Sequence, residues 1–258
     1  MRISIVTPSF NQGEFIEQTI RSVIEQDYSD VEHIIVDGGS TDGTVSILSR
    51  YPHLRWKSER DAGQSNAINK GFQESTGQVL AWINSDDYYE SNIFGSIVGY
   101  FEAHPDCMIL YGDITYVRKD GEFLKRTSGD ILNYDNLVRS PDIVRQPSSF
   151  WRRSLLDEIG SLDEDLHIVM DFDFFLRAAK RYKFHYLSRN LSFYRSYGEN
   201  KTGSSRIRQT YEILKVFRKQ GIRLNRLRIR YLLVKLLDSI GVGHILRRLI
   251  RLSNVGQA

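Results

Sequence analysis

Short apolar runs alternate with amphipathic stretches along the first half of the chain. The runs cover residues 3–8, 33–36 and 79–83, and each one leads into a polar loop; residues 54–57 are a further candidate strand. Between the first two runs, apolar residues recur with the spacing of one helix face: Phe15, Ile16, Ile20, Val23 and Ile24. A repeated order of strand, loop and helix predicts an α/β fold around a mostly parallel sheet.

The pattern changes in the second half. Four further segments look extended, the last two of them as edge strands: residues 108–111, 114–117, 184–187 and 191–197. Beyond Gly203 the apolar residues return to helical spacing, now among many basic residues. We therefore expect one α/β domain over residues 1–203 and a basic amphipathic helical tail over residues 204–258.

Charge is distributed unevenly between these two parts. Residues 201–258 hold fourteen Lys and Arg against two acids, Glu212 and Asp238, and so carry +12. Because the whole chain carries +3, the first 200 residues carry −9. A basic segment favours an anionic partner, either nucleic acid or an anionic membrane surface. No span of the tail reaches the roughly 20 uninterrupted apolar residues of a transmembrane helix, so we expect it to lie on a membrane rather than cross one.

The composition and the first residues of the chain indicate what kind of protein this is and where in the cell we expect it. A hydrophobic fraction of 41% and a charged fraction of 26% are typical of a globular protein. The single cysteine, Cys107, excludes an internal disulfide framework and a cysteine-rich zinc site. The first residues lack the apolar core and the cleavage site of a signal peptide. We expect a cytoplasmic protein, with the tail as a possible peripheral attachment to the inner face of the membrane; the oligomeric state stays open.

The strongest candidate for chemistry is the segment Trp82-Ile83-Asn84-Ser85-Asp86-Asp87, where an apolar run ends in an amide, a hydroxyl and two carboxylates. Hard oxygen ligands of this kind suit Mg²⁺ or Mn²⁺, especially when a diphosphate completes the coordination shell. Open α/β sheets also bind their ligands at the carboxyl ends of strands. The alternative is a solvated turn, because Asn, Ser and Asp are common turn formers.

Four motifs in this order resemble those of the family 2 glycosyltransferases. They are residues 6–11 (Val-Thr-Pro-Ser-Phe-Asn), 35–44 (Ile-Val-Asp-Gly-Gly-Ser-Thr-Asp-Gly-Thr), 61–63 with 69–71, and 82–87. Each motif alone is ordinary turn chemistry, but four in one order are specific. The resemblance spans roughly residues 1–200 and implies a GT-A fold with a nucleotide-binding, Rossmann-like half and an acceptor half.

The resemblance also implies roles for single residues in donor binding. Thr7 and Pro8 would lie against the nucleotide, and Asp37 would accept a hydrogen bond from the base or the ribose. Asp61 would help to fix the nucleoside. An ionised carboxylate suits the uracil N–H because it only accepts hydrogen bonds. The remaining residues assigned to donor-nucleotide binding on the same grounds are Gly38, Gly63 and Ser85.

In the family, residues 84–87 correspond to the metal-binding carboxylate motif. The first position here is Asn84, where many members have Asp, so one negative charge is missing and an oxygen donor remains. Asp86 is the expected ligand of Mn²⁺ or Mg²⁺, with Asp87 as a second ligand or its support. The metal would act as a Lewis acid on the departing nucleoside diphosphate.

By the same resemblance Asp171 is the catalytic base. It corresponds to the aspartate of the family's Glu-Asp pair, and Met170 replaces the Glu. Asp171 would take the proton of the acceptor hydroxyl in a single displacement that inverts the anomeric carbon. Desolvation by Phe172, Phe174 and Phe175 would raise its pKa and make it a stronger base.

Three further residues and the tail each have both a functional and a structural interpretation. Arg145, Gln146 and Trp151 are candidates for donor or acceptor contacts, because Arg offers a fork for phosphate and Trp a stacking face for sugar. Structural roles fit all three residues equally well. The tail is open in the same way: either it docks on an anionic membrane and meets a lipid-linked acceptor, or its helices pack on the acidic body or pair two subunits.

The sequence thus predicts an enzyme that moves a sugar from a nucleotide-sugar, with UDP as the expected nucleotide, to a saccharide or lipid-linked acceptor in cell-surface polysaccharide synthesis. A sugar-phosphate nucleotidyltransferase would also use paired aspartates and a metal, but the first loop, residues 9–13, has no basic residue for a phosphate. A nucleic-acid-binding module is disfavoured by the few aromatics of the tail and the acidic body.

Overall fold

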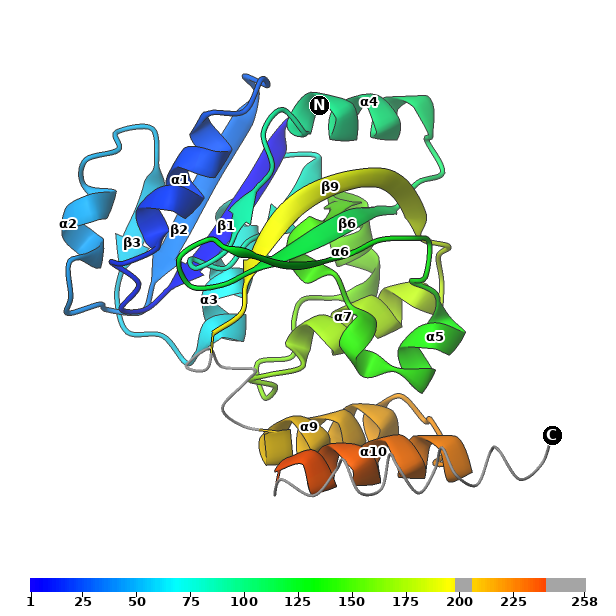
Figure 1. Cartoon of the computed structure of the whole chain (residues 1–258). Helices are drawn as coiled ribbons and strands as arrows, with labels where there is room; N and C mark the ends of the chain where they lie inside the picture. The colour runs from blue at the N-terminus through cyan, green and yellow to red at the C-terminus, as the bar shows by residue number, and fades with distance from the viewer. Residues whose placement is uncertain (198–205, 240–258) are drawn as a thin grey trace.

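The strands of the chain join in one curled sheet with two different halves (Figure 1). The computed structural model describes residues 1–197 and 206–239, and within them nine strands pair in the order β3-β2-β1-β4-β8-β6-β9-β5, with β7 beside β6. The strands are β1 (Ile3–Ser9), β2 (Val31–Asp37), β3 (Arg55–Ser58), β4 (Val79–Trp82), β5 (Tyr88–Tyr89), β6 (Ile109–Val117), β7 (Phe123–Thr127), β8 (Ser149–Arg152) and β9 (His185–Arg195).

The first half of the sheet is parallel, as its sequence pattern predicts. Strand β1 pairs in parallel with β2 and β4, and β2 pairs in parallel with β3. Beyond β4 the pairing is mixed: β8 is antiparallel to both β4 and β6, whereas β9 is parallel to β6. The carboxyl ends of β1, β2 and β4 therefore open at one edge, where the polar loops after them meet.

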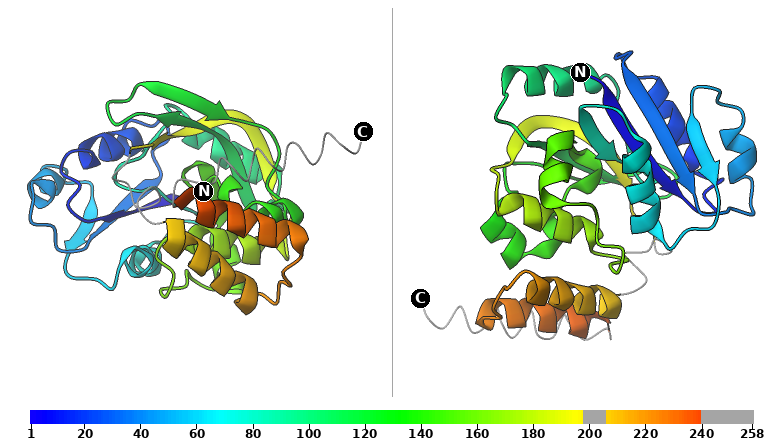
Figure 2. Two further views of the ribbon diagram at one scale, coloured as in Figure 1. Left: turned by 60° about the horizontal axis from the view of Figure 1, so that its bottom comes forward. Right: turned by 180° about the vertical axis from the view of Figure 1, so that it is seen from behind.

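Helices cover both faces of this sheet (Figures 1 and 2). The helices are α1 (Ile16–Ile24), α2 (Thr44–Leu48), α3 (Gln64–Glu74), α4 (Phe94–Ala103), α5 (Tyr134–Arg139), α6 (Arg153–Ile159), α7 (Met170–Ala179), α9 (Arg206–Lys219) and α10 (Arg226–Ser239), with 3-10 turns η1 (Pro141–Ile143) and η2 (Gln146–Ser148). Helices α9 and α10 lie side by side against the body, next to α5 and α7. The helical pattern expected at residues 245–250 lies outside the described residues.

The four extended segments predicted in the second half form only two strands in the structure, because each pair of segments is continuous. Residues 109–117 form β6 without interruption, and residues 185–195 form β9, which lies between β6 and β5 rather than at an edge. The polar residues within each strand sit at shifts in the β6–β9 register, around Gly112 and Asp113. Gly112 is required there, because a Cβ atom would lie 2.5 Å from Cγ of Leu191. The prediction of edge strands was wrong, because the basic residues interleaved along β9 suggested an exposed strand, whereas β9 has a partner on each side.

Helix α9 contributes to the main apolar core. Ile213, Val216 and Phe217 are at most 1% exposed and belong to the same cluster as Trp82 and Trp151. The ring of Phe217 lies 6.1 Å from that of Phe172 on α7. Of the two interpretations of the tail, packing on the body therefore applies to this face of α9. Within the described residues, no helix is long and apolar enough to span a membrane.

Candidate active site

The strand ends and the loops after them surround a large cavity. Its volume is about 1630 Å³. Its walls come from β1, β4, β6, η1, the starts of α3 and α7, the end of β9, the two C-terminal helices and the loops after β1, β2, β3 and β4. Its lining includes Gly38 and Asp61 in the loops after β2 and β3, which we call the donor-side end, and Pro141 in η1 with Ile213 in α9, which we call the tail-side end. Nine residues expected at the site line it: Pro8, Gly38, Asp61, Gly63, Asn84, Ser85, Asp86, Gln146 and Asp171.

Two residues assigned to donor binding lie behind the cavity wall. Thr7 is fully buried, and its hydroxyl lies 2.9 Å from Nε2 of His33. Burial lowers the pKa of His33 to about 3, so this imidazole is neutral. Asp37 is also fully buried, and it accepts hydrogen bonds from the backbone N–H groups of Gly39 and Ser40 at 3.2 and 2.8 Å. Asp37 therefore shapes the glycine loop.

The side chains at the donor-side end are tightly placed. Asp61 accepts a hydrogen bond from the Gly63 N–H at 2.8 Å. A Cβ atom at Gly38 would lie 2.9 Å from Oδ2 of Asp61 and 3.4 Å from the ring of Phe10. The absence of a side chain at Gly38 thus leaves this carboxylate and this ring facing the cavity together. Phe10 is 60% exposed, which is unusual for a large aromatic residue beside a buried strand.

Residues 84–87 after β4, which we call the acidic loop, receive hydrogen bonds from α1 and from β9. The Thr19 hydroxyl of α1 donates to the carbonyl oxygens of Ser85 and Asp87, at 2.9 and 2.7 Å. From β9, the N–H of Arg195 donates to Oδ1 of Asp87 at 2.9 Å, and its guanidinium donates to the Asp86 carbonyl at 2.6 Å. The loop is therefore fixed before any ligand arrives.

The two carboxylates of this loop differ in position. Asp86 lines the cavity, and its Oδ2 accepts a hydrogen bond from the Tyr197 hydroxyl at 2.8 Å. Asp87 is 1% exposed and is not among the residues that line the cavity. Burial raises the pKa of Asp86, and burial beside the Asp86 carboxylate raises the pKa of Asp87 well above its usual range.

Asn84 has a physical reason to be an amide. Its Oδ1 accepts a hydrogen bond from Nε2 of Gln64 at 2.8 Å, and its Nδ2 donates to Oδ2 of Asp87 at 3.5 Å. A carboxylate at this position would face buried Asp87 with like charge instead of an N–H donor. The neutral residue thus supports Asp87 from the donor-side end.

The donor set suits a divalent metal held jointly with a substrate. Among the described residues, no three His, Cys, Asp or Glu side chains come together as a metal site. The cavity offers the Asp86 carboxylate, with Asp87 directly behind it. Mg²⁺ is commonly held by one or two carboxylates plus substrate phosphates rather than by a complete protein cage. The residues present therefore fit Mg²⁺ or Mn²⁺ bound together with a diphosphate.

Asp171 also lines the cavity, at the second residue of α7. Its Oδ1 accepts a hydrogen bond from the Phe172 N–H at 2.8 Å. Burial raises its pKa to about 6, and the charge of Asp142 acts in the same direction. The expectation of a raised pKa is confirmed. A carboxylate with this pKa is a stronger base than an exposed aspartate and is still ionised at neutral pH.

Arg145 and Trp151 are core residues in this structure. Arg145 is 1% exposed and donates to the carbonyl oxygens of Gly112 and Ser128 at 3.2 and 2.9 Å. Trp151 is fully buried, with its ring 5.3 Å from that of Trp82. Neither lines the cavity, so the structural interpretation applies to both. Gln146 does line it, but its amide donates to the Trp82 carbonyl at 2.5 Å.

Several cavity residues have no clear signal in the sequence. Phe10 is a single aromatic in a polar loop, and Tyr197 follows the last strand of the sheet. Further residues reach the wall from the start of α3, from the loop before α7 or from the C-terminal helices: Gln64, His167, Gln209, Ile213 and Lys235. The tail residues were assigned to a separate segment, so only long-range packing places them here.

The sequence model of glycosyl transferase family 2 matches residues 4–187. An uncharacterized glycosyltransferase of Mycobacterium tuberculosis is 32% identical over 182 residues, which are 69% of this chain and 68% of that protein. A PGL/p-HBAD biosynthesis glycosyltransferase of Mycobacterium bovis is 28% identical over 180 residues, 67% of this chain and 68% of that protein. These relatives and the fold identify a glycosyltransferase. The chain belongs to glycosyl transferase family 2.

Solved structures agree on the fold. TarS 1–349 of S. aureus in complex with UDP-GlcNAc has a TM-score of 0.69 and 19% identity, and the match covers 92% of this chain and 67% of that one. The mannosyltransferase PcManGT of Pyrobaculum calidifontis, in complex with GDP-Man and Mn²⁺, has a TM-score of 0.63 and 19% identity, covering 87% and 65%. The GT-A fold expected from the motifs is confirmed.

Proposed function

We propose that this protein is an inverting, metal-dependent glycosyltransferase that moves a sugar from a nucleotide-sugar to a hydroxyl group of its acceptor. One observation carries the proposal: Asp86 and Asp171, the expected metal ligand and the expected base, line the same cavity as Gly38 and Asp61. A displacement that inverts the anomeric carbon needs the leaving diphosphate and the base at one place.

The donor nucleotide binds at the end beside Gly38 and Asp61. The Phe10 ring offers a flat apolar face to a base, and the Asp61 carboxylate accepts hydrogen bonds from the nucleoside. Uracil fits a carboxylate partner because its ring N–H is a donor. A UDP-sugar is therefore the proposed donor, in keeping with the UDP-GlcNAc bound by TarS.

Asp86 holds the metal, with Asp87 as its buried support. When bound, the metal supplies a Lewis acid to the departing diphosphate. Asp171 accepts the proton of the acceptor hydroxyl, so that the oxygen attacks the anomeric carbon as the bond to the diphosphate breaks. Its partial burial in the cavity wall raises the pKa of this base to about 6.

The acceptor enters at the tail-side end. Pro141, Val144 and Ile213 give this end apolar walls, and Gln209 and Lys235 add polar groups. A saccharide, free or lipid-linked, presents both kinds of surface. A role in the synthesis of cell-surface polysaccharide or glycolipid follows from such an acceptor and agrees with the PGL/p-HBAD biosynthesis relative.

The outer surface of the C-terminal helices is proposed to rest on an anionic membrane. Helix α9 exposes large apolar side chains along one face: Ile207, Tyr211 and Leu214. Helix α10 exposes a second such stripe: Ile229, Leu233 and Leu236. Basic residues surround both stripes, and each Lys or Arg near an anionic surface adds about 1 kcal/mol of attraction. Such a surface would bring the site to lipid-linked acceptors on the cytoplasmic side.

Point variants test membrane docking better than deletion, because α9 fills part of the core. Ile229→Ser with Leu233→Ser should reduce co-sedimentation with vesicles that contain phosphatidylglycerol, and should leave the melting temperature nearly unchanged. Binding that is equal in wild type and variant, or absent in both, would contradict the membrane proposal.

A donor screen tests the proposed reaction directly. The protein is incubated with UDP-, GDP- and dTDP-sugars and Mn²⁺, and the released nucleoside diphosphate is measured. Slow hydrolysis of one sugar nucleotide is expected, with water in place of the acceptor. Formation of a sugar nucleotide from a sugar phosphate and a nucleoside triphosphate would instead favour the nucleotidyltransferase. Failure to bind or hydrolyse any sugar nucleotide would contradict the glycosyltransferase proposal.

A further inference from the structure

Three consecutive backbone N–H groups in front of α7 point to one carboxylate. The N–H groups of His167, Ile168 and Val169 donate to Oε2 of Glu212 at 3.1, 2.8 and 3.3 Å. Glu212 belongs to α9 and is 3% exposed, so water cannot replace it as the acceptor. Its other oxygen accepts a hydrogen bond from Nε of Arg208 at 3.0 Å. Successive N–H groups of this kind form an anion-binding concavity, which the chain fills with its own side chain.

These three residues precede the helix that carries Asp171. Helix α7 begins at Met170, and its N-cap residue, Val169, gives no side-chain hydrogen bond to the first turn. Residues 167–172 all line the cavity. The position of the Glu212 carboxylate therefore determines where this stretch of wall lies, and with it the position of Asp171.

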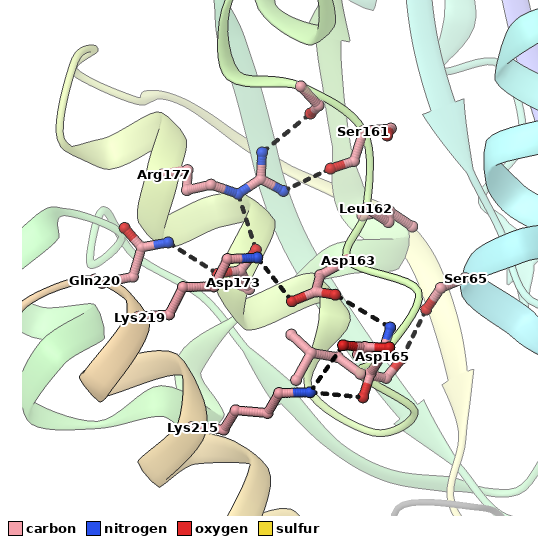
Figure 3. Close-up of polar contacts among 12 residues, drawn as sticks. Ser65, Ser161, Leu162, Asp163, Asp165, Asp173, Arg177, Lys215, Lys219 and Gln220 are labelled. Carbon is pink, nitrogen blue, oxygen red and sulfur yellow. Dashed lines mark hydrogen bonds and ion pairs between the residues drawn. The ribbon is translucent and has the colours of Figure 1, made fainter.

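Other contacts attach the same loop to α9 at its exposed side (Figure 3). Lys219 pairs with Asp163 at 2.9 Å, and Lys215 pairs with Asp165 at 3.3 Å. Both lysines are at least 38% exposed, and surface ion pairs of this kind stabilise by less than about 1 kcal/mol. They attach α9 to the body without reaching residues 167–169.

Simple docking of α9 does not account for Glu212. The helix already buries Ile213, Val216 and Phe217 against the body. A buried carboxylate costs free energy unless its hydrogen bonds compensate for lost hydration. Here these bonds all go to the cavity wall and to Arg208, which indicates a role in placing that wall.

We propose that Glu212 is a positioning residue for catalysis, which holds the segment 167–169 so that Asp171 faces the acceptor hydroxyl. The proposal rests on the proposed function, because it assumes that Asp171 is the base. Glu212 lies beyond residue 187, where the match to the family model ends. A helix beyond this match therefore supports the stretch of cavity wall that carries Asp171.

Glu212→Gln tests the proposal, because it keeps the size of the side chain and removes its charge. The rate of sugar-nucleotide hydrolysis should fall by about 10- to 100-fold, the scale of a displaced catalytic group, while the Kd for UDP with Mn²⁺ changes less than about twofold. Amide hydrogen exchange of residues 167–169 should become faster. The matched control is Lys215→Gln with Lys219→Gln on the same helix, which should leave all three quantities within about twofold of wild type.

Glu212→Asp covers the case in which the Gln variant does not fold, because it keeps the charge and shortens the side chain. A fall in the hydrolysis rate with unchanged UDP affinity in either variant supports the proposal. Unchanged hydrolysis together with unchanged exchange overturns it, as does an equal loss in the lysine control. If the wild-type protein hydrolyses no sugar nucleotide, the proposed function fails instead, and the exchange measurement alone decides whether Glu212 fixes the segment.

Discussion

Tyr197 donates its hydroxyl hydrogen to Oδ2 of Asp86 over 2.8 Å and so links the end of β9 to the acidic loop after β4. Two residues earlier, Arg195 binds the same loop through its backbone and its guanidinium. The Tyr197 ring lies 5.5 Å from that of Phe15, which keeps the hydroxyl in place. The carboxylate expected to bind the metal is thus oriented by a residue that no motif contains.

Replacing Asp86 should remove the metal dependence of nucleotide binding. In Asp86→Asn, Mn²⁺ should no longer strengthen the binding of UDP, because the amide lacks the charge that holds the cation. Isothermal titration of UDP with and without Mn²⁺ gives the result. Asp157→Asn is the control, because Asp157 is exposed and does not line the cavity. Metal-dependent UDP binding that survives in Asp86→Asn would show that the metal site has been misplaced.

Tyr197→Phe should weaken Mn²⁺ binding without preventing it. Loss of the hydrogen bond leaves the Asp86 carboxylate less well oriented, and a change of this kind typically costs about 10-fold in metal affinity. Titration with Mn²⁺ in the presence of UDP, followed by electron paramagnetic resonance, measures the free ion. An unchanged Mn²⁺ affinity would mean that the hydroxyl has no part in orienting the ligand.

Asp171→Asn should abolish most of the turnover and leave UDP affinity unchanged. The expected loss is on the order of 10²- to 10⁴-fold, the usual contribution of general base catalysis. In the wild type, the base is active when ionised, so the rate should rise with pH through about 6 and level off above it. A wild-type rate that does not change between pH 5 and pH 7.5, at constant UDP affinity, would argue against this base.

The same substitution should stabilise the folded protein above pH 6. Burial raises the pKa of Asp171 from 3.8 to about 6, so the folded state binds the proton more tightly than the unfolded state. Ionisation therefore costs stability, fully above the folded pKa and not at all below the unfolded pKa. For a partly exposed group we expect about 1 to 2 kcal/mol. Urea unfolding of both proteins at pH 7.5 and pH 4 should show the gain only at the higher pH.

Two helical glycines give opposite predictions for the fold. A Cβ atom at Gly71 in α3 would lie 2.4 Å from Cγ1 of Val6, so Gly71→Ala should destabilise by about 1 to 3 kcal/mol. Gly99 in α4 has no neighbour within 4 Å of that position, so Gly99→Ala should stabilise by about 0.5 to 1 kcal/mol. Thermal unfolding of the pair measures both. A stable Gly71→Ala would mean that α3 lies farther from β1.

The sequence predicted the parallel half of the sheet because its strands are apolar runs that end in polar loops. It also predicted that the loops after β1, β2, β3 and β4 meet at one site, but not that Pro141, Val144 and His167 line the same cavity. The sequence did not show that Asp86 faces the cavity whereas Asp87 is buried, because adjacent residues in a loop can face either way. Thr7, Asp37 and Trp151 have chemistry suited to a ligand, but in the structure they are hydrogen-bonded or packed behind the wall.

The structure of the second half of the chain was harder to predict, because its contacts join residues that are far apart in the sequence. The polar breaks within β6 and β9 are matched to each other only when the strands pair. An amphipathic basic helix has the same pattern whether its apolar face meets a membrane or a core. Glu212 was one of two acids in the tail, and its three backbone partners lie more than forty residues away.

The contact between Glu212 and residues 167–169 has a consequence for how such enzymes diversify. A tail exchanged between relatives, by recombination or by design, would carry away the carboxylate and leave its three N–H partners behind. A working hybrid therefore has to inherit α9 together with the loop that it supports, although the two are separated by α7 and β9 in the chain. Acceptor preference would then change by replacement of this pair as one unit, with the nucleotide-binding half left intact.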